Sequence, residues 1–133
     1  MGGDRWARQT FDSSVQFLLP DGSALSPDAS WVSNEALVRL SRQERREFLR
    51  LRPEFIVEVM SPSDRLKRAK AKMENWMKNG VQLGWLIDAD KQTVYVYRKG
   101  RNPVTRRNML ELAADAPLEG FVLKLGFIWR GLR

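Results

Sequence analysis

The pattern of hydrophobic and polar positions predicts strands and helices arranged around one core. Residues 54–60, "EFIVEVM", are almost continuously apolar, which is typical of a strand buried on both faces. Residues 83–88 and 93–98, "LGWLID" and "TVYVYR", flank the short segment "ADKQ" and predict a β-hairpin. Residues 29–33, "ASWVS", predict a further short strand after the bend at "SPD".

A helical period follows the buried strand. Residues 64–79 place a stripe of apolar side chains on one face, which predicts an amphipathic helix that packs on the sheet. The stripe consists of Leu66, Ala69, Met73, Trp76 and Met77. We expect Ser63 to cap the start of this helix and Gly80 to end it.

The remaining segments give weaker patterns. Residues 11–19 predict a strand, and Asn34 is a candidate N-cap for a polar helix over 35–51. Residues 121–128 fit either a last strand or a short helix. This order of strands and helices predicts an α/β fold with a mixed β-sheet. Because no repeat or linker interrupts the pattern, we expect residues 1–133 to form a single domain.

Composition narrows the chemistry that the chain can perform. Hydrophobic residues make up 43% of the chain and charged residues 29%, as expected for a globular protein. No segment has the apolar run of a membrane span or a signal peptide, so we expect a cytoplasmic protein. Cysteine and histidine are both absent, which excludes thiolate and imidazole catalysis. Any metal would therefore have oxygen ligands, which favours magnesium, manganese or calcium.

The charge of the chain favours a polyanionic partner. The formal net charge is +7, with basic runs at residues 65–72 and 98–107. We interpret the second run as a basic loop suited to phosphate contacts, although an ordinary solvated loop fits equally well. A nucleic acid is one partner that this charge suits; a positive charge with no functional role is an equal alternative.

Glu58 is an acid in the middle of the buried strand. Side chains alternate along a strand, so Ile56, Glu58 and Met60 share a face. An ionised carboxylate in such surroundings costs several kcal/mol unless it is paired or bound to a metal. The residues alone leave two explanations open, an internal salt bridge to an arginine and a metal site.

Asp28 is a possible second ligand, because it opens the strand at 29–33. Carboxylates from adjacent strands can hold a divalent cation, and the backbone carbonyl of Val59 is a further candidate ligand. Lys72 flanks the apolar stripe of the predicted helix and could reach back toward the sheet. The alternative is that Lys72 and the other cations of this helix are simply solvated.

These residues also carry a resemblance to a known family. The segments "LSPDASWVS", "PEFIVEVMSPSDRL", "KMENWMKNGVQLGWLID" and "TVYVYR" resemble the Uma-type restriction endonuclease family of the PD-(D/E)XK nuclease superfamily. The likeness runs from about Phe11 to Trp129. It implies a restriction-endonuclease-like mixed sheet flanked by helices and a site for Mg²⁺ or Mn²⁺. Asp28 matches the first acid of the motif and Glu58 the second.

The chain departs from the superfamily pattern in two places. The lysine usually lies two residues after the second acid, where this chain has Met60. In the Uma-type pattern the next helix supplies it, which corresponds to Lys72. Family members usually carry a longer helical segment before the strand that begins at Phe11, whereas ten residues precede it here. The resemblance thus implies a shortened member, or a homodimer in which another subunit supplies the cover.

Three functions remain open from the sequence. The leading hypothesis is a metal-dependent DNA endonuclease, in which Asp28, Glu58 and the Val59 carbonyl bind Mg²⁺ or Mn²⁺ and Lys72 assists phosphodiester hydrolysis. The alternative is a non-catalytic nucleic-acid-binding protein on a degenerate nuclease fold. A third hypothesis is a structural or interaction module whose positive charge is incidental.

Overall fold

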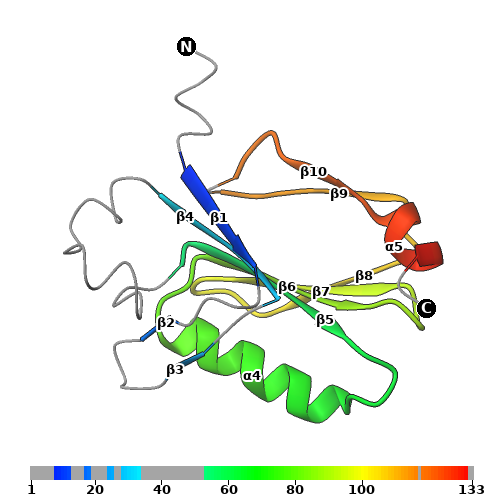
Figure 1. Cartoon of the computed structure of the whole chain (residues 1–133), viewed down its shortest axis with the longest axis horizontal. Helices are drawn as coiled ribbons and strands as arrows, with labels where there is room; N and C mark the ends of the chain where they lie inside the picture. Colours follow the sequence, from blue (N-terminus) through cyan, green and yellow to red (C-terminus); the bar gives the residue numbers. More distant parts are fainter. Residues whose placement is uncertain are drawn as a thin grey trace.

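A mixed β-sheet runs through the centre of the computed structural model (Figure 1), which describes residues 8–12, 17–18, 24–25, 28–33, 53–116 and 118–131. Within these residues the main sheet has six strands in the order β1-β4-β5-β6-β7-β8. The strands are β1 (Arg8–Asp12), β4 (Ala29–Ser33), β5 (Phe55–Met60), β6 (Leu83–Asp88), β7 (Thr93–Arg98) and β8 (Val104–Arg107). Only β5 and β6 pair in parallel, which confirms the predicted α/β fold with a mixed sheet.

The helix α4 (Leu66–Lys78) connects β5 to β6 and covers one face of the sheet (Figure 1). Its apolar stripe faces the strands, and Met73 and Trp76 are fully buried. Gly84 on β6 allows this close packing, because a Cβ atom there would lie 2.9 Å from the end of the Met73 side chain. Met73 and Trp76 belong to a first hydrophobic core, which lies between α4 and the sheet. Its other buried members are Ile56, Val81, Leu86, Tyr95 and Tyr97.

The opposite face is covered by β9 (Glu111–Ala113), β10 (Val122–Lys124) and α5 (Leu125–Gly131) (Figure 1). The second core lies beneath them and includes an edge-to-face contact between Phe55 and Trp85 at 5.1 Å. Its other buried members are Leu83, Ile87, Ala89, Val94, Val96, Leu112, Leu118, Leu125 and Trp129. Since both faces are covered, all six residues of β6 are buried, which explains the unbroken apolar run in its sequence.

Most predicted elements of the central sheet are confirmed. The predicted strand at 29–33 and the hairpin of 83–88 with 93–98 have the predicted bounds. The strand predicted at 54–60 begins one residue later, at Phe55. Residues 121–128 contain both predicted alternatives, because β10 is followed directly by α5.

Three other predictions fare differently. Of the strand predicted at 11–19, residues 11–12 belong to β1, residues 17–18 form β2 (Phe17–Leu18), which pairs with β3 (Ala24–Leu25), and the others lie outside the described residues. The basic loop predicted at 98–107 is wrong in its second half, where β8 pairs with β7. The helix predicted over 35–51 lies outside the described residues.

The two ends of α4 show one failed and one confirmed prediction. Ser63 does not cap the helix: Arg65 occupies the N-cap position and makes no side-chain capping bond. At the other end Gly80 has φ +92°, the left-handed region that favours glycine. The N–H of Gly80 donates to the Met77 carbonyl, and the N–H of Val81 to the Trp76 carbonyl. These paired bonds form a Schellman motif, which fixes where the helix ends before β6.

The predicted cytoplasmic location and the predicted single domain both stay predictions. No helix within the described residues is long and apolar enough to cross a membrane. The predicted single domain over residues 1–133 includes segments outside the described ranges.

Replacing Gly80 tests the end of α4. We expect Gly80→Ala to lower the free energy of unfolding by about 1–2 kcal/mol, because a Cβ atom disfavours the left-handed backbone. Urea denaturation followed by circular dichroism measures the change. Gly126→Ala, in α5 where the new methyl group meets nothing closer than 3.7 Å, is the control and should keep stability or raise it by up to about 1 kcal/mol, because alanine is the better helix former. Equal effects of the two substitutions would contradict the assigned geometry of Gly80.

Candidate active site

The candidate site lies where β4 stops pairing with β5. The ladder between these strands runs from Trp31–Phe55 to Ala29–Val57 and goes no further. Beyond it, the backbone N–H of Val59 donates to Asp28 Oδ2 at 2.5 Å. The Asp28 side chain thus takes over the hydrogen bond that a continuing strand would have made, which holds its carboxylate beside β5.

Glu58 is buried, with 7% of its surface exposed, and its carboxylate contacts two side chains of α4. Trp76 Nε1 donates to Glu58 Oε2 at 2.9 Å, and Lys72 Nζ lies 2.9 Å from the same oxygen. Both donors belong to α4, whose apolar stripe packs on the sheet and brings their side chains to Glu58. The open explanation of a salt bridge to an arginine is thereby corrected, since the ion-pair partner is Lys72.

The surroundings of Glu58 favour its protonated form. Burial raises the pKa of the Glu58 carboxyl above its ordinary value of 4.5, and this effect outweighs the donors that lower the pKa, Trp76 first and then Lys72. The negative charge of Asp28 raises the pKa of Glu58 further. The two carboxylates therefore repel each other, which a cation bound between them would relieve.

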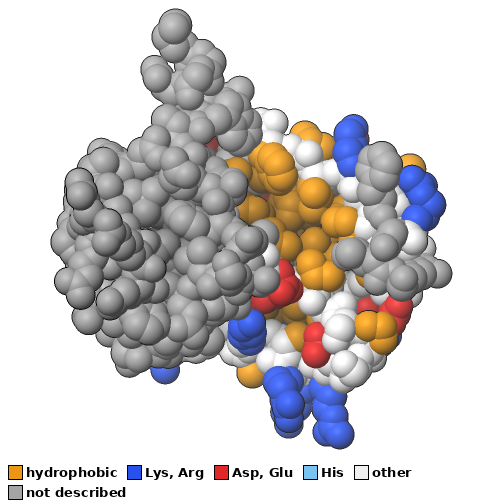
Figure 2. Space-filling view, viewed as in Figure 1, with side chains coloured by type: hydrophobic (Ala, Val, Ile, Leu, Met, Phe, Trp, Pro, Cys, Tyr) orange, Lys and Arg blue, Asp and Glu red, His pale blue; other side chains and the backbone are white. Residues whose placement is uncertain are grey.

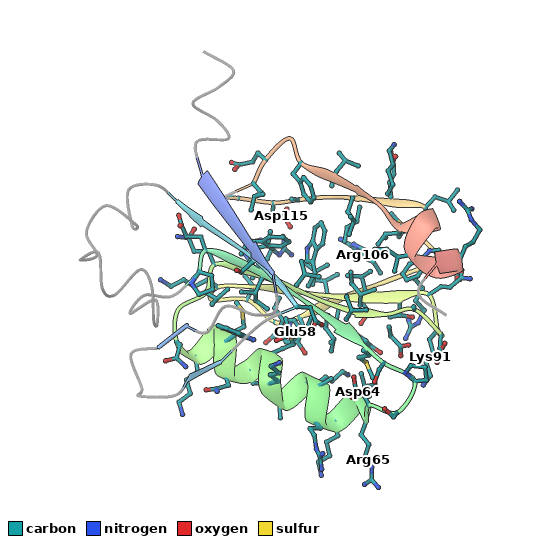
Figure 3. The ribbon with its side chains drawn as sticks, viewed as in Figure 1. Glu58, Asp64, Arg65, Lys91, Arg106 and Asp115 are labelled. Carbon is teal, nitrogen blue, oxygen red and sulfur yellow. The ribbon has the colours of Figure 1, made fainter. Side chains whose placement is uncertain are left out.

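A pocket of about 230 Å³ brings all the predicted site residues together. Figure 3 shows Glu58 between the sheet and α4, with Asp64 and Arg65 near the start of the helix. The pocket is lined by Asp28, Glu58, Val59, Met60, Asp64, Arg65, Arg68, Ala69, Lys72 and Leu86. The arrangement combines two carboxylates with a lysine whose side chain is 40% exposed and so open to a ligand.

The donor set fits a hard divalent cation. Within the described residues no group of three or more acidic side chains is close enough to form a closed metal site. Asp28, Glu58 and the Val59 carbonyl offer oxygen ligands only, and Mg²⁺ in proteins commonly uses one or two carboxylates and keeps several waters. An open site of this kind would suit a cation shared with a phosphate.

The sequence did not single out two features of the pocket. Trp76 was assigned to the core, which is correct, but its indole N–H is also a partner of Glu58. A buried tryptophan on a helix that faces a buried acid is a usable signal, because indole N–H groups seek acceptors. Arg65 and Arg68 line the pocket as well, and in the sequence only their membership of a basic run marked them.

The mixed sheet with its helices is a restriction-endonuclease-like fold, and comparison with known proteins identifies the family. The chain belongs to the Uma2 family, described as "Putative restriction endonuclease", whose model matches residues 4–126. The family predicted from the sequence is thereby confirmed. A search of curated protein sequences finds no match.

A solved structure shares the fold. It is the crystal structure of a protein from Anabaena variabilis ATCC 29413 described as "a putative nuclease belonging to DUF820". The TM-score is 0.71 at 22% sequence identity, over 96% of this chain and 70% of that chain. At this identity the likeness establishes the restriction-endonuclease-like fold.

The raised pKa of Glu58 predicts a pH-dependent stability. Between pH 4.5 and the raised pKa, the folded protein holds a proton that the unfolded chain has released, so stability falls as pH rises. Glu58→Gln keeps an acceptor for Trp76 but does not titrate. We expect wild type to lose stability relative to Glu58→Gln as pH rises from 4.5 to the raised pKa of Glu58, by up to about 1.4 kcal/mol per pH unit.

The measurement is urea denaturation of both proteins in metal-free buffer at a series of pH values from 4.5 upward. A stability difference that stays constant, or that grows in favour of wild type as pH rises, would show that the pKa of Glu58 is not raised.

Proposed function

We propose that this protein is a Mg²⁺-dependent DNA endonuclease that hydrolyses phosphodiester bonds. The observation that carries the proposal is the ion pair of Lys72 with Glu58, in one pocket with Asp28. Both acids and the lysine correspond to the residues that the family resemblance implies, and the lysine comes from the helix instead of the position of Met60. Family membership and the fold of a nuclease relative support the same class of activity.

Each residue has a distinct task in this proposal. Asp28 and Glu58, with the Val59 carbonyl, would hold Mg²⁺ or Mn²⁺, and such an ion supplies a Lewis acid for a phosphate and its attacking water. The Lys72 ammonium approaches the phosphate from the α4 side and stabilises the negative charge that develops during hydrolysis. Trp76 fixes the Glu58 carboxylate from within the core. The site thus combines a buried, oriented acid with an accessible cation.

The proposed DNA contacts extend beyond the pocket. Arg98 ends β7, and Lys99 and Arg101 lie in the turn that follows; all three line a second hollow of the surface. Together with the pocket-lining cations Arg65, Arg68 and Lys72 they provide the positive surface that a phosphate backbone requires. The net charge of +7 supports the same partner.

A non-catalytic nucleic-acid-binding protein is the second candidate. Glu58 already has Trp76 and Lys72 as partners, and Asp28 already accepts a bond from the backbone of Val59. Residues arranged in this way could serve the fold alone. Binding of DNA without cleavage in Mg²⁺ and Mn²⁺ would favour this candidate over the endonuclease.

The first test is cleavage of supercoiled plasmid DNA. We expect nicking or linearisation in Mg²⁺ or Mn²⁺ and none in EDTA. Lys72→Ala should reduce the rate roughly a hundredfold or more, the scale of losing one contact to transition-state charge. Asp28→Asn and Glu58→Gln should reduce it similarly, since each removes a charged ligand.

Lys78→Ala is the matched control, because Lys78 is an exposed cation of the same helix that does not line the pocket. It should cleave at the wild-type rate. Circular dichroism and urea denaturation of each variant separate a loss of chemistry from a loss of folding. Undiminished cleavage by folded Lys72→Ala would remove Lys72 from the mechanism.

The second test concerns the partner. We expect the affinity for a duplex to fall about tenfold or more between about 50 mM and about 200 mM salt, because each phosphate contact releases counterions. Fluorescence anisotropy with several unrelated duplexes in EDTA measures this and should show little sequence preference. Affinity that is independent of salt would argue against the phosphate backbone as the main ligand.

A further inference from the structure

The cations of α4 divide between two sides of the helix, and one side lines the candidate pocket. Arg65, Arg68 and Lys72 all line it and are here named the pocket row. Lys67 and Lys78 are exposed and do not line the pocket. In Figure 2, basic side chains gather at the lower edge of the molecule, over the first turns of α4. The helix thus presents more than one cation to a ligand that enters the pocket.

Helix geometry explains this division. At about 100° per residue, Arg68 falls within about 40° of Lys72 around the helix, whereas Lys67 and Lys78 point to the opposite side. Arg65 is the N-cap residue just before α4 and lines the same pocket. At about 1.5 Å per residue, Arg68 lies about 6 Å and Arg65 about 10 Å along the axis from Lys72. The pocket row is therefore a line of cations that starts at Glu58 and runs toward the beginning of the helix.

The length of the row matches a nucleic-acid strand. The phosphates of one strand rise about 3.4 Å per nucleotide along the duplex axis, so a row of about 10 Å laid along that axis covers about three nucleotide steps. Guanidinium groups bind phosphate oxygens through two parallel hydrogen bonds. Arg65 extends away from Glu58 toward solvent (Figure 3), so the row leads from the pocket to the open surface. The spacing and direction suit phosphates that leave the pocket.

The two arginines are available for such contacts. Within the parts of the chain that the structure describes, neither Arg65 nor Arg68 forms an ion pair. Asp64 is the nearby acid that lines the same pocket, and its Oδ2 accepts the Ser61 N–H at 2.7 Å. That bond holds the Asp64 side chain against the turn before α4. Both arginines remain exposed.

We propose that Arg65 and Arg68 bind the phosphates adjacent to the scissile one on the same DNA strand, and so set the direction in which this strand crosses the pocket. They are binding and positioning residues, whereas Lys72 acts at the scissile phosphate. This inference rests on the proposed function, because it takes the pocket as the place of cleavage.

The test measures binding to a short labelled DNA duplex by fluorescence anisotropy in EDTA, so that no cleavage is needed. Arg65→Ala/Arg68→Ala is compared with Lys67→Ala/Lys78→Ala, which removes the same charge from the other side of the same helix. We expect the arginine pair to lose about tenfold or more in affinity and to reduce the salt slope by about two. The lysine pair should lose less than about threefold. Arg65→Lys/Arg68→Lys should restore most of the binding.

The outcomes separate this inference from the proposed function. If wild type binds and both alanine pairs weaken binding equally, the pocket row has no special role, while an endonuclease remains possible. If wild type does not bind DNA at all, both proposals fail. Where cleavage is measurable, the arginine pair should raise KM and leave kcat nearly unchanged, whereas Lys72→Ala lowers kcat. A fall in kcat alone for the arginine pair would overturn the positioning role.

Discussion

The carboxylate of Glu58 is the constraint on which the rest of the site depends. A charged group buried in a central strand is tolerated only with partners, and Glu58 receives the Trp76 indole and the Lys72 ammonium from α4. The helix must therefore dock in one register on the sheet. A shift by one residue would rotate both donors by about 100° and leave the acid unpaired. Apolar packing alone would not select this register so strictly, since methionine adapts to many neighbours.

The contacts of Glu58 with Trp76 and Lys72 serve both folding and the proposed chemistry, and these two roles place different requirements on Lys72. Stability favours a permanent ion pair of Lys72 with Glu58, whereas catalysis needs the ammonium to reach a phosphate. The exposure of Lys72 reconciles them, because a long, half-exposed side chain can turn toward a ligand while Trp76 keeps its bond to Glu58. Asp28 has a similar double role in the proposal, because its Oδ2 also accepts a hydrogen bond from the backbone of β5.

Much of the fold was predictable from short-range patterns. The hairpin of β6 and β7 and the strand β5 follow from contiguous apolar runs, because a sheet covered on both faces needs apolar residues at every position. Glu58 and Lys72 were also identifiable, the first as an acid in such a run and the second from its helical phase.

Features that depend on long-range contacts could not be predicted from these patterns. The bond of Trp76 to Glu58 depends on how α4 docks, and β8 forms from a polar sequence because β7 offers it a partner edge. The cap at Ser63 failed because that residue lies too early, in the turn that Asp64 closes.

Supplying the lysine from a helix changes what determines the geometry of the site. A lysine at the position of Met60 would be fixed to Glu58 by two residues of one rigid strand. Lys72 is placed instead by the packing of α4, through the fully buried Met73 and Trp76 beside it. The distance between acid and ammonium thus depends on the core, and loosening that core would disturb the site before it unfolds the sheet. In return, the helix carries a continuous row of cations past the acid, which two alternating residues on a strand cannot provide. A lysine on the helix therefore couples the candidate catalytic group directly to a surface that can bind the rest of a strand.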